Sequence, residues 1–136
     1  MEDDTDKTQA TRDRSNEMQL GRNIAQRLAE FAAAVVRLSA RLPKDPTGRH
    51  IAIQMVRSAT GAGSNYEEAR AAESRADFVH KAGVALKEMR EARYWVVLVQ
   101  KTGWIEAELG AIVSEANELC AILGASVRTA RARGVN

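Results

Sequence analysis

Apolar residues recur at alternating steps of four and three along most of this chain, and that spacing constrains its fold more than any other feature. Such steps place apolar side chains on one stripe of an α-helix. The first series comprises Ile24, Leu28, Phe31, Val35, Leu38 and Leu42. A later series comprises Phe78, Ala82, Ala85, Met89, Ala92, Val96 and Val99. No segment shows the period-two alternation of a half-buried strand, so the sequence predicts an all-α protein.

Local signals divide the chain into four helices. The first ends at 43–46, because each of the two prolines there disfavours helix in the residue before it. The second is expected over residues 47–72. Ser74 begins a sequence that resembles a capping box for the third helix, and Gly103 suits a left-handed C-cap at its end. The fourth helix carries its apolar positions over 109–127. Short connections between four such helices predict an antiparallel, up-down-up-down four-helix bundle.

Charge and periodicity together set the expected domain limits. Residues 1–20 lack apolar periodicity and hold six acids and three bases, whereas residues 21–136 hold twelve acids and seventeen bases. We therefore expect a disordered polar tail over 1–20, a bundle domain over 21–132 and a C-terminal tail over 133–136. A modestly basic folded part permits a nucleic-acid partner without requiring one.

Cysteine usage and hydropathy indicate the compartment. The single cysteine, Cys120, excludes an internal disulfide and suits a reducing cytoplasm. No run approaches the roughly 20 apolar residues of a membrane span. The N-terminal segment also lacks the apolar region of a signal peptide. We expect a cytoplasmic protein that contacts no membrane.

Catalytic signals are weak. His50 and His80 stand apart from any second histidine or cysteine at metal-ligand spacing. The carboxylates that could converge in a bundle are Glu68, Glu88 and Glu91. Metal sites in bundle cores normally use a Glu-x-x-His pair, which this chain lacks. The glycines at 61 and 63 are not followed by the Lys-Ser/Thr of a phosphate loop. The sequence predicts no enzyme activity, no catalytic or metal-binding residues and no cofactor.

The second helix combines small and polar residues on one flank. Small side chains at positions 58, 61, 62, 65 and 69 form a groove that another helix can approach closely. Polar groups buried in such a contact need hydrogen-bond partners. They could form a functional polar site, but an internal network that fixes helix register is the favoured interpretation. The residues assigned to this structural polar network are Arg57, Ser58, Asn65, Glu68, Glu88 and Glu91.

The third helix contains six consecutive apolar residues over 94–99, which must point all round the helix. An isolated bundle would leave a second apolar stripe beside the main seam in contact with water, which favours a partner surface. The alternative is that Trp95 simply covers the edge of the bundle. The residues assigned to an oligomer interface are Val84, Tyr94, Trp95 and Leu98.

Basic residues make nucleic-acid binding the leading positive function. The residues expected to contact RNA or DNA are Arg22, Arg27, Arg37, Arg41, Lys44, Arg128, Arg131 and Arg133. Lysines and arginines over 81–101 add charge along the third helix. A solvated charged face, or a scaffold that binds only protein, remains the alternative. Because the aromatic residues are mostly expected in the core or an interface, stacking on unpaired bases is not expected.

An ordered set of motifs runs through the predicted bundle. These are Arg57-Ser58, Asn65-x-x-Glu68-Ala69, Phe78, Ala85-Leu86-Lys87-Glu88-x-x-Glu91, Tyr94-Trp95 and Thr102-Gly103-x-Ile105. Over residues 24–130 the chain thereby resembles the 23S rRNA intervening-sequence proteins, also called S23-type proteins. The resemblance implies a four-helix bundle in a ring-like homopentamer without established enzyme activity. A related branch, the accessory variability protein of diversity-generating retroelements, binds nucleic acid and a reverse transcriptase. The resemblance therefore implies that this chain forms a homo-oligomer. It also implies that the chain binds RNA or DNA and a partner enzyme such as a reverse transcriptase.

Overall fold

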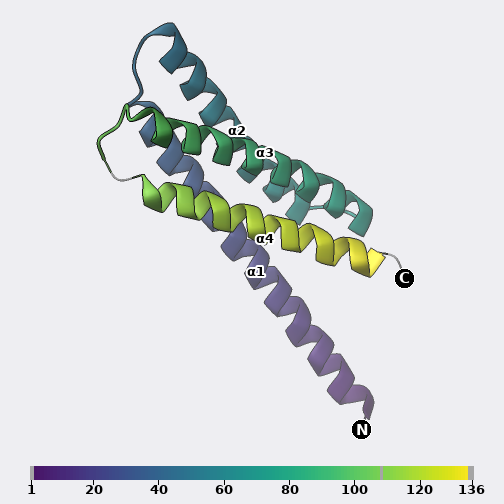
Figure 1. Ribbon diagram of the computed structural model, residues 1–136. Coiled ribbons are helices and arrows are strands. Elements are labelled where there is room, and N and C mark those ends of the chain that lie inside the picture. Colours follow the sequence, from purple (N-terminus) through teal and green to yellow (C-terminus); the bar gives the residue numbers. More distant parts are fainter. Residues whose placement is uncertain (1, 108, 135–136) are drawn as a thin grey trace.

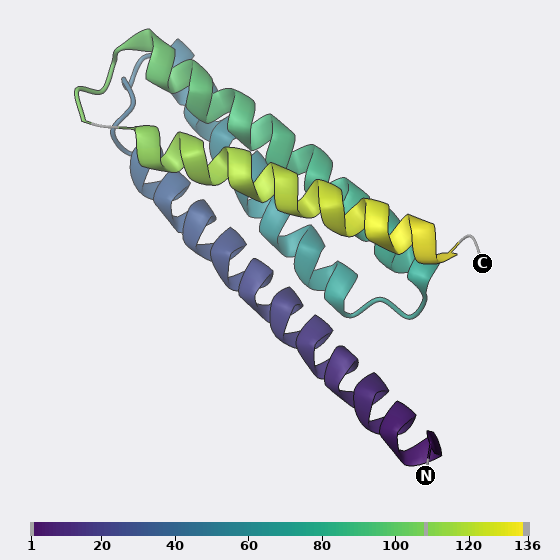
Figure 2. The ribbon, with the colours of Figure 1, turned by 60° about the horizontal axis from the view of Figure 1, so that its bottom comes forward.

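Four helices account for most of the chain. The computed structural model describes residues 2–107 and 109–134. Its helices are α1 (Glu2–Ser39), α2 (Pro46–Arg70), α3 (Arg75–Thr102) and α4 (Gly110–Gly134), and those two described stretches contain no strand. Consecutive helices run in opposite directions, with the α1–α2 and α3–α4 connections at one end and the α2–α3 connection at the other (Figure 2). The protein is a four-helix bundle, as predicted.

The helix starts follow from local capping chemistry. Asp45 caps α2 in an extended conformation, and its side chain accepts a hydrogen bond of 2.8 Å from the Gly48 backbone N–H. Ser74 caps α3, where its Oγ accepts from the Asp77 N–H at 3.1 Å. Gly103 ends α3 with a φ of 70°, a left-handed conformation that favours glycine. The predicted caps at Ser74 and Gly103 are thus confirmed.

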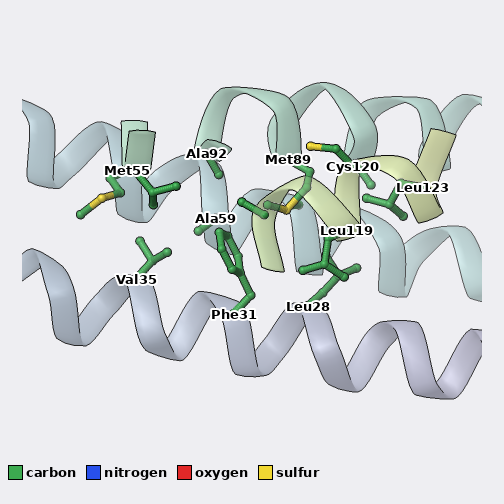
Figure 3. Close-up of a cluster of buried hydrophobic side chains, with 14 of the residues drawn as sticks. Leu28, Phe31, Val35, Met55, Ala59, Met89, Ala92, Leu119, Cys120 and Leu123 are labelled. Atoms are coloured by element: carbon green, nitrogen blue, oxygen red, sulfur yellow. The ribbon is translucent and has the colours of Figure 1, made fainter. Parts of the chain in front are cut away.

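Every helix contributes to one hydrophobic core (Figure 3). The largest buried aliphatic side chains come from all four helices and are fully enclosed: Leu28, Val35, Met55, Met89, Val96, Val99, Leu119 and Leu123. The alternating series that predicted α1 is therefore its buried stripe. Cys120 lies beside Leu119 at only 6% exposure, as a small apolar side chain of this core.

Residues 2–20 differ from the sequence prediction of a disordered tail. They form the first half of α1, which projects beyond the other helices in both ribbon views (Figures 1 and 2). The side chains over 3–20 are exposed and bond within the helix, as Lys7 does to Asp3 at 3.4 Å. One ion pair, Glu17 to Arg133 at 2.7 Å, links this segment to α4. Apolar periodicity indicates only helices with a buried face, so it does not reveal this segment, whose side chains are exposed.

The C-terminal end of the chain also differs from the sequence prediction. Arg133 and Gly134, predicted to lie in a C-terminal tail, are the last residues of α4. The rest of that predicted tail, residues 135–136, lies outside the described residues. Within the described ranges, α4 is the one helix long and apolar enough to cross a membrane by length and composition. Its apolar positions Leu119, Leu123 and Val127 are buried in the bundle, so core packing accounts for that composition.

Candidate nucleic-acid interface

Arg57 of α2 joins two carboxylates of α3 at the edge of the bundle. Its Nη1 lies 3.4 Å from Glu88 Oε2, and its Nη2 donates a shorter hydrogen bond to Glu91 Oε1. The hydrogen bond to Glu91 raises the pKa of the Arg57 guanidinium above its ordinary value. Glu91 also accepts from the Trp95 indole N–H at 3.4 Å. These four residues form one connected cluster that links α2 to α3.

One small residue of α2, Gly61, lets the Glu88 side chain of α3 lie close to the α2 backbone. A β-carbon at Gly61 would stand 3.2 Å from Glu88 Oε2, so the glycine leaves room for the Glu88 side chain. Ser58, which is fully buried, donates instead to the carbonyls of Gln54 and Met55 in its own helix.

The other members of the predicted polar network lie apart from this cluster. Asn65 donates to the Gly61 carbonyl at 2.8 Å, within its own helix. Glu68 is exposed. The structure therefore joins Arg57, Glu88 and Glu91, while Ser58 and Asn65 are satisfied within α2 and Glu68 points to solvent.

A shallow basic groove runs along the outer surface of α3 and α4, which lie side by side in both views (Figures 1 and 2). It consists of two adjoining open hollows, of about 550 Å³ and about 390 Å³, which share Arg90. The cations that line them are Lys87, Arg90, Arg93, Lys101, Arg128 and Arg131. We call this surface the α3–α4 groove.

The positive charge of the α3–α4 groove is not neutralised locally. Among the residues that the structure describes, no carboxylate lines either hollow, and no ion pair within 4.0 Å engages the six cations. His80 also borders the larger hollow. Two glycines, Gly83 and Gly124, line it without side chains, and a β-carbon at Gly83 would meet no atom within 4 Å. Two adjoining hollows lined by six cations and no described acid form a surface that would attract an anion.

The predicted nucleic-acid contacts are spread over several surfaces. Arg128 and Arg131 line the groove, whereas the exposed Arg22, Arg37, Arg41 and Lys44 lie on α1 and the α1–α2 connection. Arg27 is engaged elsewhere: its Nη2 lies 3.1 Å from Glu118, and it also pairs with Glu115. The hydrogen bond to Glu115 raises the pKa of Arg27 above its ordinary value. Arg133 pairs with Glu17. Arg27 and Arg133 therefore already have carboxylate partners.

The residues predicted to form an oligomer interface divide between two surfaces. Val84, Tyr94 and Leu98 line the α3–α4 groove. Trp95 instead packs partly buried against the core, with its ring edge-on to His50 at 6.2 Å. Tyr94 is 60% exposed, so the core of this chain does not enclose it, and its place in an interface between copies stays a prediction.

The α3 side of the α3–α4 groove is one exposed stripe of that helix. Gly83, Lys87, Arg90, Tyr94 and Lys101 follow steps of four, three, four and seven. That spacing places them on one helical face, opposite the core stripe. The same counting that found the core could have found this stripe. That α4 supplies Arg128 and Arg131 beside it depends on helix pairing, which spacing alone does not give.

The described stretches contain neither a cluster of metal ligands nor an activated nucleophilic cysteine. Over residues 2–107 and 109–134, no three histidine, cysteine or acidic side chains gather closely enough to hold a metal ion. Burial raises the pKa of the Cys120 thiol, which keeps it protonated and unreactive near neutral pH. The α3–α4 groove is therefore the strongest candidate site.

Fold and surface define a four-helix bundle protein with a basic face. The model of the 23S rRNA-intervening sequence protein family matches residues 22–125, and the chain belongs to that family. A crystal structure of a protein of unknown function from the S23 ribosomal protein family of Bacteroides thetaiotaomicron VPI-5482 is similar. It shares 32% identity and a TM-score of 0.71, over 79% of this chain and 97% of that one. Among curated proteins there is no significant match.

Proposed function

We propose that this bundle binds RNA or DNA without catalysing a reaction, and that the α3–α4 groove is its principal contact surface. The observation that supports this most is the set of six cations around two adjoining hollows whose described lining contains no carboxylate. A phosphate backbone offers the regularly spaced negative charge that such a surface attracts. Four of the six cations are arginines, which can donate two parallel hydrogen bonds to one phosphate.

Assembly would strengthen a contact that is modest in one chain. We propose a homo-oligomer, of which a pentamer is the expected form, so that several copies of the groove act on one nucleic acid. Apolar surface is available for contacts between copies or with another protein. Ile53 of α2 is 66% exposed and Val36 of α1 is 47% exposed. Removing these side chains from water would favour association.

The direct test is binding across a salt series. Labelled single-stranded RNA, single-stranded DNA and duplex DNA are titrated with the protein by fluorescence anisotropy between about 50 and about 200 mM salt. We expect binding at low salt that weakens steeply as salt rises, because neutralised phosphates release counterions. An affinity that does not change with salt concentration would contradict contacts to phosphates. Absence of binding to all three probes at about 50 mM salt would contradict the proposal itself.

A second function is supported by the exposed apolar residues Val36 and Ile53. In this alternative the bundle is a scaffold for another protein, for example an accessory subunit of a reverse transcriptase or another enzyme, without touching nucleic acid itself. The two functions differ in a simple measurement. The scaffold predicts that Ile53→Glu abolishes capture of the partner, while charge changes in the α3–α4 groove leave it intact.

A further inference from the structure

We propose that the α3–α4 groove selects single-stranded nucleic acid by stacking an unpaired base on Tyr94. This inference rests on the proposed function and specifies the form of nucleic acid that the site accepts. It needs an aromatic ring that is exposed, held in place and flanked by cations. Tyr94 meets these three conditions.

Tyr94 stands in the smaller hollow with its side chain 60% exposed. Val97 and Leu98 provide the apolar part of that hollow, and Arg90, Arg93 and Lys101 provide its positive charge. A nucleotide within a strand has the same mixed character, because its base has an apolar face and phosphates lie on either side of its sugar. The hollow therefore matches a nucleotide better than it matches either a free anion or an apolar ligand.

The ring of Tyr94 is held by its neighbour. The Tyr94 and Trp95 rings meet edge to face, with centroids 5.1 Å apart and planes at 75°. Trp95 is itself fixed by packing against the core and by its hydrogen bond to Glu91. One ring contact covers at most one face of the phenol. The exposed part of the ring can receive a base, and the contact with Trp95 reduces the side-chain entropy that stacking would cost.

The cations flank this ring along α3. Arg90 lies four residues before Tyr94 and Lys101 seven residues after it, which is about 6 Å and about 10 Å along the helix axis. Phosphates on the two sides of a stacked base would meet these side chains. Such an arrangement, an aromatic platform inside a positively charged groove, is how proteins hold single strands without reading their sequence.

Duplexes would gain little from this platform. Bases inside a duplex are already paired and stacked, so reaching Tyr94 would require extruding one of them, which opposes binding. A duplex can still contact the cations through its phosphates. The ring of Tyr94 therefore separates single strands from duplexes, while the cations attract both.

The test compares Tyr94→Ala with the conservative variant Tyr94→Phe. The probes are labelled oligo(dT) of about 12 nucleotides, a hairpin duplex of matched phosphate number, and an abasic strand of the same length. We expect Tyr94→Ala to weaken oligo(dT) binding by about 5- to 100-fold, the range that loss of one base–aromatic stack gives. Tyr94→Phe should retain the wild-type affinity. The hairpin and the abasic strand should bind all three proteins equally.

A second measurement locates the base directly. Oligo(dT) that carries 5-iodouracil is irradiated with the wild-type protein, and the crosslinked peptide is identified by mass spectrometry. We expect the crosslink at Tyr94. Crosslinks found only at other residues would overturn the stacking inference.

The outcomes separate this inference from the proposed function. If the wild type binds the hairpin as tightly as oligo(dT), or Tyr94→Ala weakens all probes equally, stacking is overturned and phosphate binding stands. If Tyr94→Ala changes the sedimentation of the protein, Tyr94 is a contact between copies and the inference is likewise overturned. If the wild type binds none of the probes, the proposed function itself fails.

Discussion

The guanidinium of Arg128 lies over Gly124, one turn earlier on α4, so closely that a β-carbon at position 124 would stand 3.2 Å from its Nη1. Gly124 is buried beneath it. The absence of a side chain therefore lets this arginine lie along the wall of the α3–α4 groove. On the α3 side of the same hollow, Gly83 likewise lines the groove without a side chain. Gly83 thus leaves the hollow open, whereas Gly124 makes room for the Arg128 guanidinium.

Filling the hollow should block the ligand without harming the fold. A β-carbon at Gly83 would meet no atom within 4 Å, so Gly83→Leu places its side chain in the open groove. We expect it to weaken nucleic-acid binding several-fold while the melting temperature stays unchanged or rises. Gly83→Ala is the matched control: it should stabilise the protein by about 0.5–1 kcal/mol, as alanine does in a helix interior, and retain binding. Equal binding by both variants would place the ligand elsewhere.

Gly48 should be the least replaceable glycine of the bundle. A β-carbon there would stand 2.0 Å from the Pro43 carbonyl oxygen, a backbone atom that cannot move without opening the α1–α2 connection. We expect Gly48→Ala to lower the free energy of unfolding by more than about 2 kcal/mol, the scale of severe overpacking. Urea denaturation followed by circular dichroism measures it. A loss below that of an average surface substitution would show that this connection is not packed as described.

Cys120 should react slowly while the bundle is folded. The side chain is 6% exposed, and burial raises the pKa of its thiol. The folded protein therefore favours the protonated thiol, which contributes stability below the ordinary thiol pKa. That contribution is lost as pH rises through the higher pKa of the folded state. We expect a thiol reagent to modify Cys120 quickly in urea and very slowly in buffer near neutral pH. Rapid modification of the native protein would contradict its burial.

The Arg57 cluster and Glu68 should behave differently, although both belong to the network predicted from the sequence. Arg57 bridges Glu88 and Glu91, so Arg57→Ala leaves two neighbouring carboxylates without their cation. Glu68 is exposed. We expect Arg57→Ala to lower the melting temperature, with a smaller effect at high salt, and Glu68→Ala to leave it unchanged. A melting temperature lowered more by Glu68→Ala would contradict this assignment.

The sequence predicted the fold well where the signal was periodic burial or backbone conformation. The stripe from Ile24 to Leu42 is buried as its spacing requires, and Ser74 and Gly103 mark the ends of α3. These features depend on residues close in sequence. The prediction differed from the structure for residues 2–20, because a fully exposed helix leaves no apolar period to detect.

The candidate site was only partly predictable for a related reason. The cations of α3 are visible in the sequence, but their opposite wall, Arg128 and Arg131, depends on how α3 pairs with α4. The apolar run over 94–99 predicts one shared interface for Tyr94 and Trp95, yet their side chains point to different surfaces. Adjacent residues on a helix are separated by about 100°, so an apolar run does not say which of its members will face solvent.

The central claim, that nucleic acid binds at the α3–α4 groove, is tested most directly by two double variants of equal charge. Arg128→Gln with Arg131→Gln removes two charges from the groove, and Arg37→Gln with Arg41→Gln removes two exposed charges from α1 and its end. Affinity for oligo(dT) is measured for each across the salt series. We predict that the groove variant loses about 10-fold or more and that its salt slope falls by about 2, while the α1 variant changes little. An equal loss in both variants, or a larger loss in the α1 variant, would contradict the claim.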